Sequence, residues 1–249
     1  MINATIEARL GSSRFPNKVL KKINHRSFLE FQINRVKKSK LISNIIVATT
    51  NQNKDHKIIN LCKKNKVKYF KGSVNNVLKR ITLAHVENES KIVVRLCGDN
   101  PFQDPNMIDD TIKEYLKGKH DIVCYGGNPK IRKIPYGLDV EVLSLKLLKD
   151  TLRKTNKKLY LEHPAKYLYD VRKNLKIKFL KPKNKILYAP KLSFSLDYPD
   201  QYKFLKKVYN LSKNENITYK DLLLKIRKNK KVLKLANILS DKYILNRKF

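Results

Sequence analysis

Short apolar segments alternate with amphipathic segments through the first half of the chain. Apolar runs typical of buried parallel strands stand at 45–48, 92–96 and 122–125, and shorter strand-like runs stand at 2–7 and 67–70. Between these runs, apolar residues recur at helical spacing. This alternation predicts an α/β fold with a doubly wound, mainly parallel sheet and right-handed crossovers.

The pattern changes beyond the last of these runs. Residues 138–143 alternate apolar and acidic side chains, which predicts a strand with one polar face. Two helices and a strand around 177–179 are expected within 144–190, and another strand is expected at 193–197. We interpret about 144–190 as a small inserted α+β region, or a dimerisation region, of one domain spanning residues 1–249.

The composition sets limits on the class of protein. The chain has 249 residues, of which 41% are hydrophobic, and this suits a single α/β domain. No apolar run approaches the ~20 residues needed to cross a bilayer, and strand-like sequence begins at once. We therefore expect a cytoplasmic protein with neither a membrane span nor a signal peptide. Three isolated cysteines without a Cys-x-x-Cys pair argue against a disulfide framework and a zinc site: Cys62, Cys97 and Cys124.

The chain is strongly basic, with 56 Lys and Arg against 21 Asp and Glu and a net charge of +35. Such a charge attracts polyanions, and nucleic acid is the first partner to consider. The cations are spread along the whole chain, however, and no RNA-binding aromatic motif or zinc-finger spacing is present. The abundance of Lys, Asn and Ile also fits the codon bias of an AT-rich genome. We therefore disfavour nucleic acid as the main partner and keep a basic, non-enzymatic polyanion-binding protein as the alternative from another class.

The stretch from Ala8 to Leu20 carries the densest candidate chemistry. It follows the first predicted strand, and loops at strand carboxyl ends are where open α/β sheets bind ligands. Its small residues let a ligand reach backbone N–H groups, and its cations suit phosphate, although charge alone would favour solvated surface cations. We predict a polyphosphate site here, formed by Ala8, Arg9, Leu10, Gly11, Ser12, Ser13, Arg14 and Lys18.

The order of residues in this stretch is specific. Seven positions follow the pattern A-R-x-x-S-x-R-x-P-x-K-x-L: Ala8, Arg9, Ser12, Arg14, Pro16, Lys18 and Leu20. The pattern resembles the signature loop of the CMP-sugar synthetases, which are the acylneuraminate and 3-deoxy-manno-octulosonate cytidylyltransferases, and of the related spore-coat SpsF-type proteins. The resemblance implies a nucleotide-diphospho-sugar transferase fold of GT-A-like, Rossmann type. It also implies transfer of CMP from CTP to a 2-keto-3-deoxy sugar acid, with release of pyrophosphate, for surface polysaccharide or lipopolysaccharide biosynthesis.

Two carboxylates follow predicted strands. Taken alone, Asp99 is equally a turn residue and Asp197 equally a helix cap. The segment 98–101 resembles the family's G-D-x-P metal-binding loop, and 197–200 resembles its late D-T-P-E-D-like motif, with Tyr198 in place of the usual Thr. The resemblance implies Mg²⁺ held by Asp99 and Asp197. It also implies catalytic roles for three residues: Arg9, Lys18 and Asp99.

Two further segments are candidates for the nucleotide side. Residues 72–80 resemble the G-S-x-x-D-V-L-x-R segment of SpsF-like proteins, with Asn76 where Asp is usual. Within it, Arg80 is either a ligand-binding residue or a helix-surface cation. Thr49, at the end of the second predicted strand, is placed to contact the base.

The sugar side is expected to involve acidic residues and a histidine. Residues 135–142 match the SpsF-like P-D-G-L-D-V-E-V pattern well, and Asp139 and Glu141 alternate onto one face, where both can point into a site. A solvent-facing polar edge is the alternative. His163 belongs to an E-H pair that also resembles that group, although a lone histidine is more often structural.

The resemblance extends from the first strand to about residue 202. It implies CTP and a sugar acid as substrates and a homodimer as the assembly. Within the same fold, the alternative is a nucleotidyltransferase or glycosyltransferase-like protein that uses another sugar acceptor.

Overall fold

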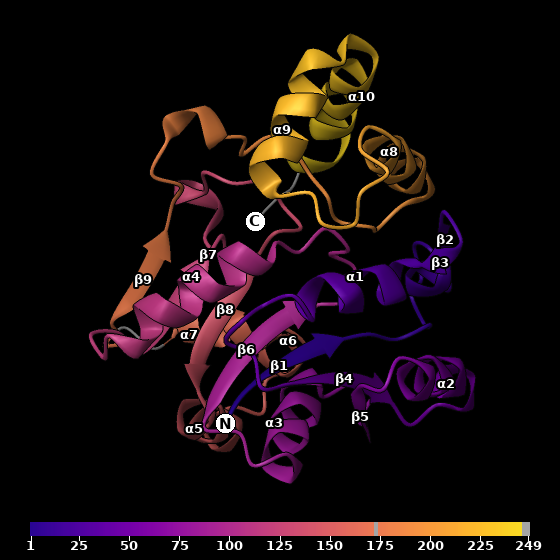
Figure 1. The fold of residues 1–249 in the computed structure, drawn as a ribbon. Helices are drawn as coiled ribbons and strands as arrows, with labels where there is room; N and C mark the ends of the chain where they lie inside the picture. The colour runs from indigo at the N-terminus through magenta and orange to yellow at the C-terminus, as the bar shows by residue number, and fades with distance from the viewer. Residues whose placement is uncertain (172–173, 246–249) are drawn as a thin grey trace.

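A seven-stranded sheet runs through the molecule, with helices on both of its faces (Figure 1). This computed structural model describes residues 1–171 and 174–245. Within these residues only one strand, β8, runs antiparallel to its neighbours, so the predicted doubly wound, mainly parallel α/β fold is confirmed. In spatial order the strands are β5 (Lys68–Gly72), β4 (Asn44–Thr50), β1 (Ile2–Glu7), β6 (Ile92–Cys97), β8 (Val140–Ser144), β7 (Ile122–Tyr125) and β9 (Ile177–Leu180).

The helices form the two outer layers. One face of the sheet packs into the larger hydrophobic core with α1 (Phe28–Val36), α2 (His56–Lys64), α4 (Pro105–Leu116), α8 (Pro199–Asn210), α9 (Tyr219–Lys228) and α10 (Lys230–Ser240). The other face packs with α3 (Val77–Glu87), α5 (Leu145–Lys154), α6 (Lys158–Glu162) and α7 (Pro164–Asp170). A two-stranded hairpin of β2 (Lys22–Ile23) and β3 (Arg26–Ser27) precedes α1. No helix of the described part is long and apolar enough to cross a membrane.

Side-chain alternation along the strands explains the two layers. In β6, Val94 and Leu96 enter the larger core, whereas Val93 enters the smaller core on the opposite face. Because successive side chains of a strand point to opposite faces, a nearly continuous apolar run fits a strand that is buried on both sides. A side-chain cap marks the start of α1, where Ser27 Oγ accepts a hydrogen bond from the backbone N–H of Glu30 at 3.1 Å.

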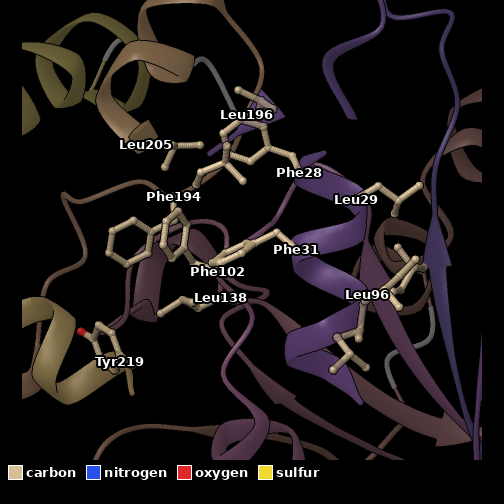
Figure 2. Close-up of a cluster of buried hydrophobic side chains, with 14 of the residues drawn as sticks. Phe28, Leu29, Phe31, Leu96, Phe102, Leu138, Phe194, Leu196, Leu205 and Tyr219 are labelled. Carbon is tan, nitrogen blue, oxygen red and sulfur yellow. The ribbon is translucent and has the colours of Figure 1, made fainter. Parts of the chain in front are cut away.

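Aromatic side chains join two loops that matter for the site. Phe102, in the loop after β6, lies between Phe31 of α1 and Phe194, with ring centroids 5.2 Å and 5.6 Å away (Figure 2). All three rings are almost fully buried. Aromatic contacts of this geometry add to the stabilisation that burial alone provides. The loop after β6 and the segment around Phe194 are therefore fixed to each other by the core.

Two expectations for the later half of the chain were wrong in detail. The segment 193–197 forms a single bridge, between Ser193 and Tyr136, and not a strand. The reason is that its backbone bonds go to separate loops: the N–H of Phe194 donates to Tyr136 O, and the N–H of Leu196 donates to Asp99 O. The described residues of 144–190 form three α-helices, α5, α6 and α7, where two were expected, and β9 extends the main sheet. The single domain and the dimerisation role of this region stay predictions.

Buried His85 in α3 provides a pH-dependent contribution to stability. Its ring nitrogens contact Thr5 Oγ1 at 3.1 Å and Ser90 Oγ at 2.8 Å, and burial lowers the pKa of the imidazole to about 3. The unfolded chain binds a proton near pH 6.5, so stability is lost as the pH falls from 6.5 towards 3. We expect the wild type to lose about 2 kcal/mol more than His85→Gln between pH 7.5 and 5. Urea unfolding of both proteins at both pH values measures this difference, and equal losses would contradict it.

Candidate active site

The strand order of the sheet reverses at β1, which has β4 on one side and β6 on the other. Open α/β sheets bind ligands outside the carboxyl ends of their strands at such a reversal. A cavity of about 450 Å³ lies at this place. The predicted site residues that line it are Ala8, Arg9, Ser12, Ser13, Arg14, Lys18, Arg80, Asp99, His163 and Asp197.

The first loop, residues 8–17, is held by a carboxylate from a distant part of the chain. Asp55 Oδ1 accepts a hydrogen bond from the backbone N–H of Leu10 at 2.8 Å, and its Oδ2 accepts from both the N–H and the hydroxyl of Thr50. Asp55 is fully buried. A buried carboxylate needs such donors, so the loop and the end of β4 are fixed together.

The second loop, which follows β6, is fixed just as closely. A Cβ at Gly98 would lie 2.4 Å from the carbonyl oxygen of Glu7, so only glycine lets the two strand ends approach this closely. Beyond it, Asp99 accepts a backbone hydrogen bond from Leu196 at 2.8 Å. The carboxylates at 99 and 197 are thereby brought to the same side of the cavity.

Four charged side chains meet at this side: Arg14, Lys18, Asp99 and Asp197. Lys18 Nζ donates to Asp99 Oδ2 at 2.7 Å and to Asp197 Oδ1 at 2.9 Å, and Arg14 Nη2 donates to the same Asp197 oxygen at 2.8 Å. Burial opposes the charge on Lys18, but the two carboxylates outweigh it and raise the pKa of the ammonium. The group is therefore a charged cluster of two cations and two anions at neutral pH.

The donor set of this cluster fits a magnesium ion. Oxygens of Asp99 and Asp197 converge on one cation, the Lys18 ammonium, and carboxylate oxygens are the ligands that Mg²⁺ prefers. Among the residues that the structure describes, no group of three or more His, Cys, Asp or Glu is placed to hold a metal. Two carboxylates would thus be the protein's share, and phosphate and water would complete the coordination, as is usual for Mg²⁺.

Arg95 of β6 lies on the floor of the cavity between two carboxylates. Its Nε donates to Glu7 Oε1 at 2.6 Å, and its Nη1 donates to Glu141 Oε2. Burial opposes the guanidinium charge, but the carboxylates outweigh it and raise the pKa of Arg95 well above the usual value. Glu7 and Arg95 both line the cavity. This trio contributes one net negative charge beneath the cation-rich entrance.

The remaining cavity walls come from α3 and from α6. Arg9 reaches towards the loop before α3 and towards α6, since its Nη1 lies 3.4 Å from Val74 O and its Nη2 lies 3.9 Å from Glu162 Oε1. Arg80 is only 3% exposed, and its Nε has no hydrogen-bond partner within the described structure. His163 follows Glu162 and lines the same wall.

Comparison with known proteins decides the family. The family model described as cytidylyltransferase matches residues 4–241. The chain belongs to the cytidylyltransferase family. It is an enzyme of the nucleotidyltransferase class, as the sequence predicted.

Similar proteins agree with this family. A cytidylyltransferase of Leptospira borgpetersenii has a similar structure, with a TM-score of 0.88, 27% identity, and coverage of 95% of this chain and 97% of that one. The spore coat polysaccharide biosynthesis protein SpsF of Bacillus subtilis is 28% identical over 82% of this chain and 84% of its own. A 3-deoxy-manno-octulosonate cytidylyltransferase of Leptospira interrogans is 29% identical over 48% of this chain and 47% of its own.

Three predicted nucleotide-binding residues of this cytidylyltransferase do not line the cavity. Leu10 is buried in the core, and its N–H is taken by Asp55. Thr49 is fully buried in β4. Gly11 is exposed at the far side of the first loop, where an added Cβ would meet Lys54 Nζ at 3.1 Å.

Asp139, just before β8, and Glu141, within β8, are not among the residues that line the cavity, and their predicted contact with a sugar stays a prediction. Asp139 pairs with Arg132 and accepts backbone N–H groups of the two turns at Gly127 and Gly137. Glu141 is occupied by Arg95 and by the hydroxyl of a tyrosine in α7. Both carboxylates are therefore paired within the protein, at the edge of the site.

Sequence reasoning missed three residues of the site: Glu7, Asp55 and Arg95. Asp55 stands at the N-cap of α2, but its side chain makes no cap hydrogen bond there and holds the first loop instead. Glu7 and Arg95 are charged residues of two central strands, β1 and β6, whose other side chains are largely buried. A charged residue in a predicted buried strand is the sequence signal that could have identified them, because a buried charge requires a partner.

Proposed function

We propose that this cytidylyltransferase transfers CMP from CTP to the anomeric hydroxyl of a 2-keto-3-deoxy sugar acid of the nonulosonic or octulosonic type, for surface polysaccharide biosynthesis. The observation that carries the proposal is the cluster of Arg14, Lys18, Asp99 and Asp197 at the cavity. The likeness to a polysaccharide biosynthesis protein and to a 3-deoxy-manno-octulosonate enzyme supports the acceptor class. A cytoplasmic location and a homodimer accompany the proposal as predictions.

The reaction places specific demands on the site. A bond forms between the anomeric oxygen and the α-phosphorus, the bond from the α-phosphorus to the bridging oxygen breaks, and pyrophosphate leaves. The proton of the anomeric hydroxyl passes to solvent or to a basic group. Charge grows on the departing pyrophosphate, so cations fixed beside it lower the barrier. Arg14 and Lys18 are fixed by carboxylates before any nucleotide binds, and they fulfil this requirement.

Asp99 and Asp197 are the residues that would hold Mg²⁺ in this reaction. Their oxygens already converge on one cationic group. When bound, Mg²⁺ supplies positive charge to the phosphates and polarises them. The Lys18 ammonium contacts the same two carboxylates, so it would lie beside an ion held there.

The acceptor is proposed to bind at the wall formed by α6. Glu162 and His163 reach the cavity there, opposite the first loop, and offer hydrogen-bond partners for sugar hydroxyls. Arg9 lies 3.9 Å from Glu162 and is half-exposed, so it is placed between the nucleotide and the acceptor. A carboxylate on the acceptor would find its partner in this guanidinium.

Pyrophosphate release tests the proposal. The protein with Mg²⁺ is incubated with each of the four nucleoside triphosphates against a panel of nonulosonic and octulosonic acids and, separately, sugar 1-phosphates. We expect release with CTP and a sugar acid only. Release only with a sugar 1-phosphate would overturn the acceptor class, and release with another nucleotide would overturn the nucleotide.

A further inference from the structure

The C-terminal part of the chain contacts the site through stacked side chains. The ring of Tyr243, in the π-helical turn Asp241–Leu245 after α10, stacks on the ring of Tyr198 with centroids 4.2 Å apart and planes 13° apart. The guanidinium of Arg14 also lies over the Tyr198 ring, 5.2 Å from its centroid. Tyr243 therefore contacts Tyr198, and Tyr198 contacts Arg14. Of these three residues, Arg14 lines the cavity.

A second set of contacts ties the same turn to the start of α8. The hydroxyl of Tyr243 donates to Asp200 at 2.7 Å and 2.9 Å, and Lys242 Nζ donates to Asp200 at 2.8 Å. The next residue, Gln201, accepts the backbone N–H groups of Asp197 at 2.7 Å and of Tyr198 at 3.1 Å. α10 and α8 lie side by side in Figure 1. The turn after α10 is thereby joined to the first turn of α8, next to the segment that carries Tyr198.

Arg14 needs neighbouring side chains to hold it because its own side chain is largely exposed to solvent. Its side chain is 54% exposed, whereas its partner Asp197 is only 10% exposed. A long, exposed arginine loses much rotamer freedom when it is held against a phosphate. A ring beneath its guanidinium and a carboxylate at its end restrict it before the nucleotide arrives, and such preorganisation improves affinity.

We infer that Tyr198 and Tyr243 are positioning residues that hold Arg14 for the triphosphate of CTP, so that the C-terminal turn is part of the nucleotide site. The inference rests on the proposed function, in which Arg14 binds the triphosphate. Neither tyrosine lines the cavity, so both act through Arg14.

A double-mutant cycle on the equilibrium Kd for CTP tests the inference. Tyr243→Ala is expected to raise the Kd about fivefold, and Tyr243→Phe, which keeps the ring, is expected to stay within about twofold of the wild type. In an Arg14→Ala background, Tyr243→Ala is expected to change nothing further, because its effect passes through Arg14. Saturating CTP should restore most of kcat, so the KM for CTP is expected to change more than kcat. Ile238→Ala, at a 52% exposed site on α10, is the matched control and is expected to bind CTP like the wild type.

The outcomes separate the inference from the proposed function. If Arg14→Ala itself leaves the Kd unchanged, the proposed role of Arg14 fails. If Arg14→Ala weakens binding while Tyr243→Ala does not, or if the two losses add, the inference alone fails. If thermal melting shows that Tyr243→Ala is unfolded, Tyr198→Thr and Tyr243→Leu replace it. Tyr198→Thr is expected to raise the Kd for CTP. In the Tyr198→Thr background, Tyr243→Leu is expected to have no further effect on the Kd. An undiminished effect of Tyr243→Leu in that background would overturn the inference.

Discussion

Replacing Asp99 with asparagine is expected to lower kcat for pyrophosphate release from CTP by about a hundredfold to a thousandfold. The substitution keeps the size of the side chain but removes one of the two negative charges that hold Lys18 at 2.7 Å and 2.9 Å. It also halves the carboxylate share of the proposed Mg²⁺ site. The loss falls on the step in which phosphate charge moves, so kcat falls more than binding weakens. Steady-state kinetics at saturating CTP and Mg²⁺ measure it.

The control for this variant is the same substitution at an exposed carboxylate. Asp110→Asn, on the surface of α4, removes one negative charge far from the cluster and is expected to leave kcat within about twofold, since exposed charges act weakly. Asp99→Asn with wild-type kcat would contradict the assignment of the charged cluster as the catalytic centre.

Replacing Arg35 with methionine is expected to lower the free energy of unfolding by about 3 kcal/mol or more. Arg35 of α1 is 1% exposed, and its guanidinium donates to the carbonyl oxygens of Gln103, Glu215 and Ile217 at 2.8 Å, 2.6 Å and 3.0 Å. Methionine fills the space of the stem but leaves these buried acceptors without donors, and each costs about 1–3 kcal/mol. Burial also lowers the pKa of Arg35 to about 10. The free-energy cost of burying the charge therefore offsets part of the stabilisation that its hydrogen bonds provide.

Urea unfolding at neutral pH measures this change. The matched control is Arg153→Met, whose side chain is 78% exposed on α5 and which is expected to shift stability by less than about 0.5 kcal/mol. A loss below 1 kcal/mol for Arg35→Met would mean that water or a backbone shift satisfies the three carbonyls. The loop after β6 bonds to Arg35 through Gln103, so a real loss of stability would also loosen the segment that carries Asp99.

Periodicity and turn chemistry predicted most of the fold. The parallel strands and the loops at the carboxyl ends of β1 and β6 follow from local patterns, because each burial pattern is set within a few residues. The segment 193–197 was different. Phe194 and Leu196 are buried, but their backbone bonds go to separate loops, which no local pattern encodes.

The site residues likewise fall into those that local motifs predict and those whose contacts only the folded structure reveals. Arg14, Lys18, Asp99 and Asp197 lie in recognisable motifs and do meet. Asp139 has the predicted alternation but the wrong partner, since a strand pattern gives the face of a side chain and not what lies across from it. The hold of Asp55 on the first loop joins residues 45 positions apart, and only the packed fold reveals such a contact.

The most direct test of the central claim is a crystal structure of the protein with CTP and Mg²⁺. The account predicts the triphosphate in the cavity at the ends of β1 and β6, with its oxygens on Arg14 and Lys18 and beside Asp99 and Asp197. A second, larger cavity of about 740 Å³ lies between α4, the end of β9 and α9. A nucleotide bound there, with Arg14 and Lys18 free of phosphate, would contradict the account.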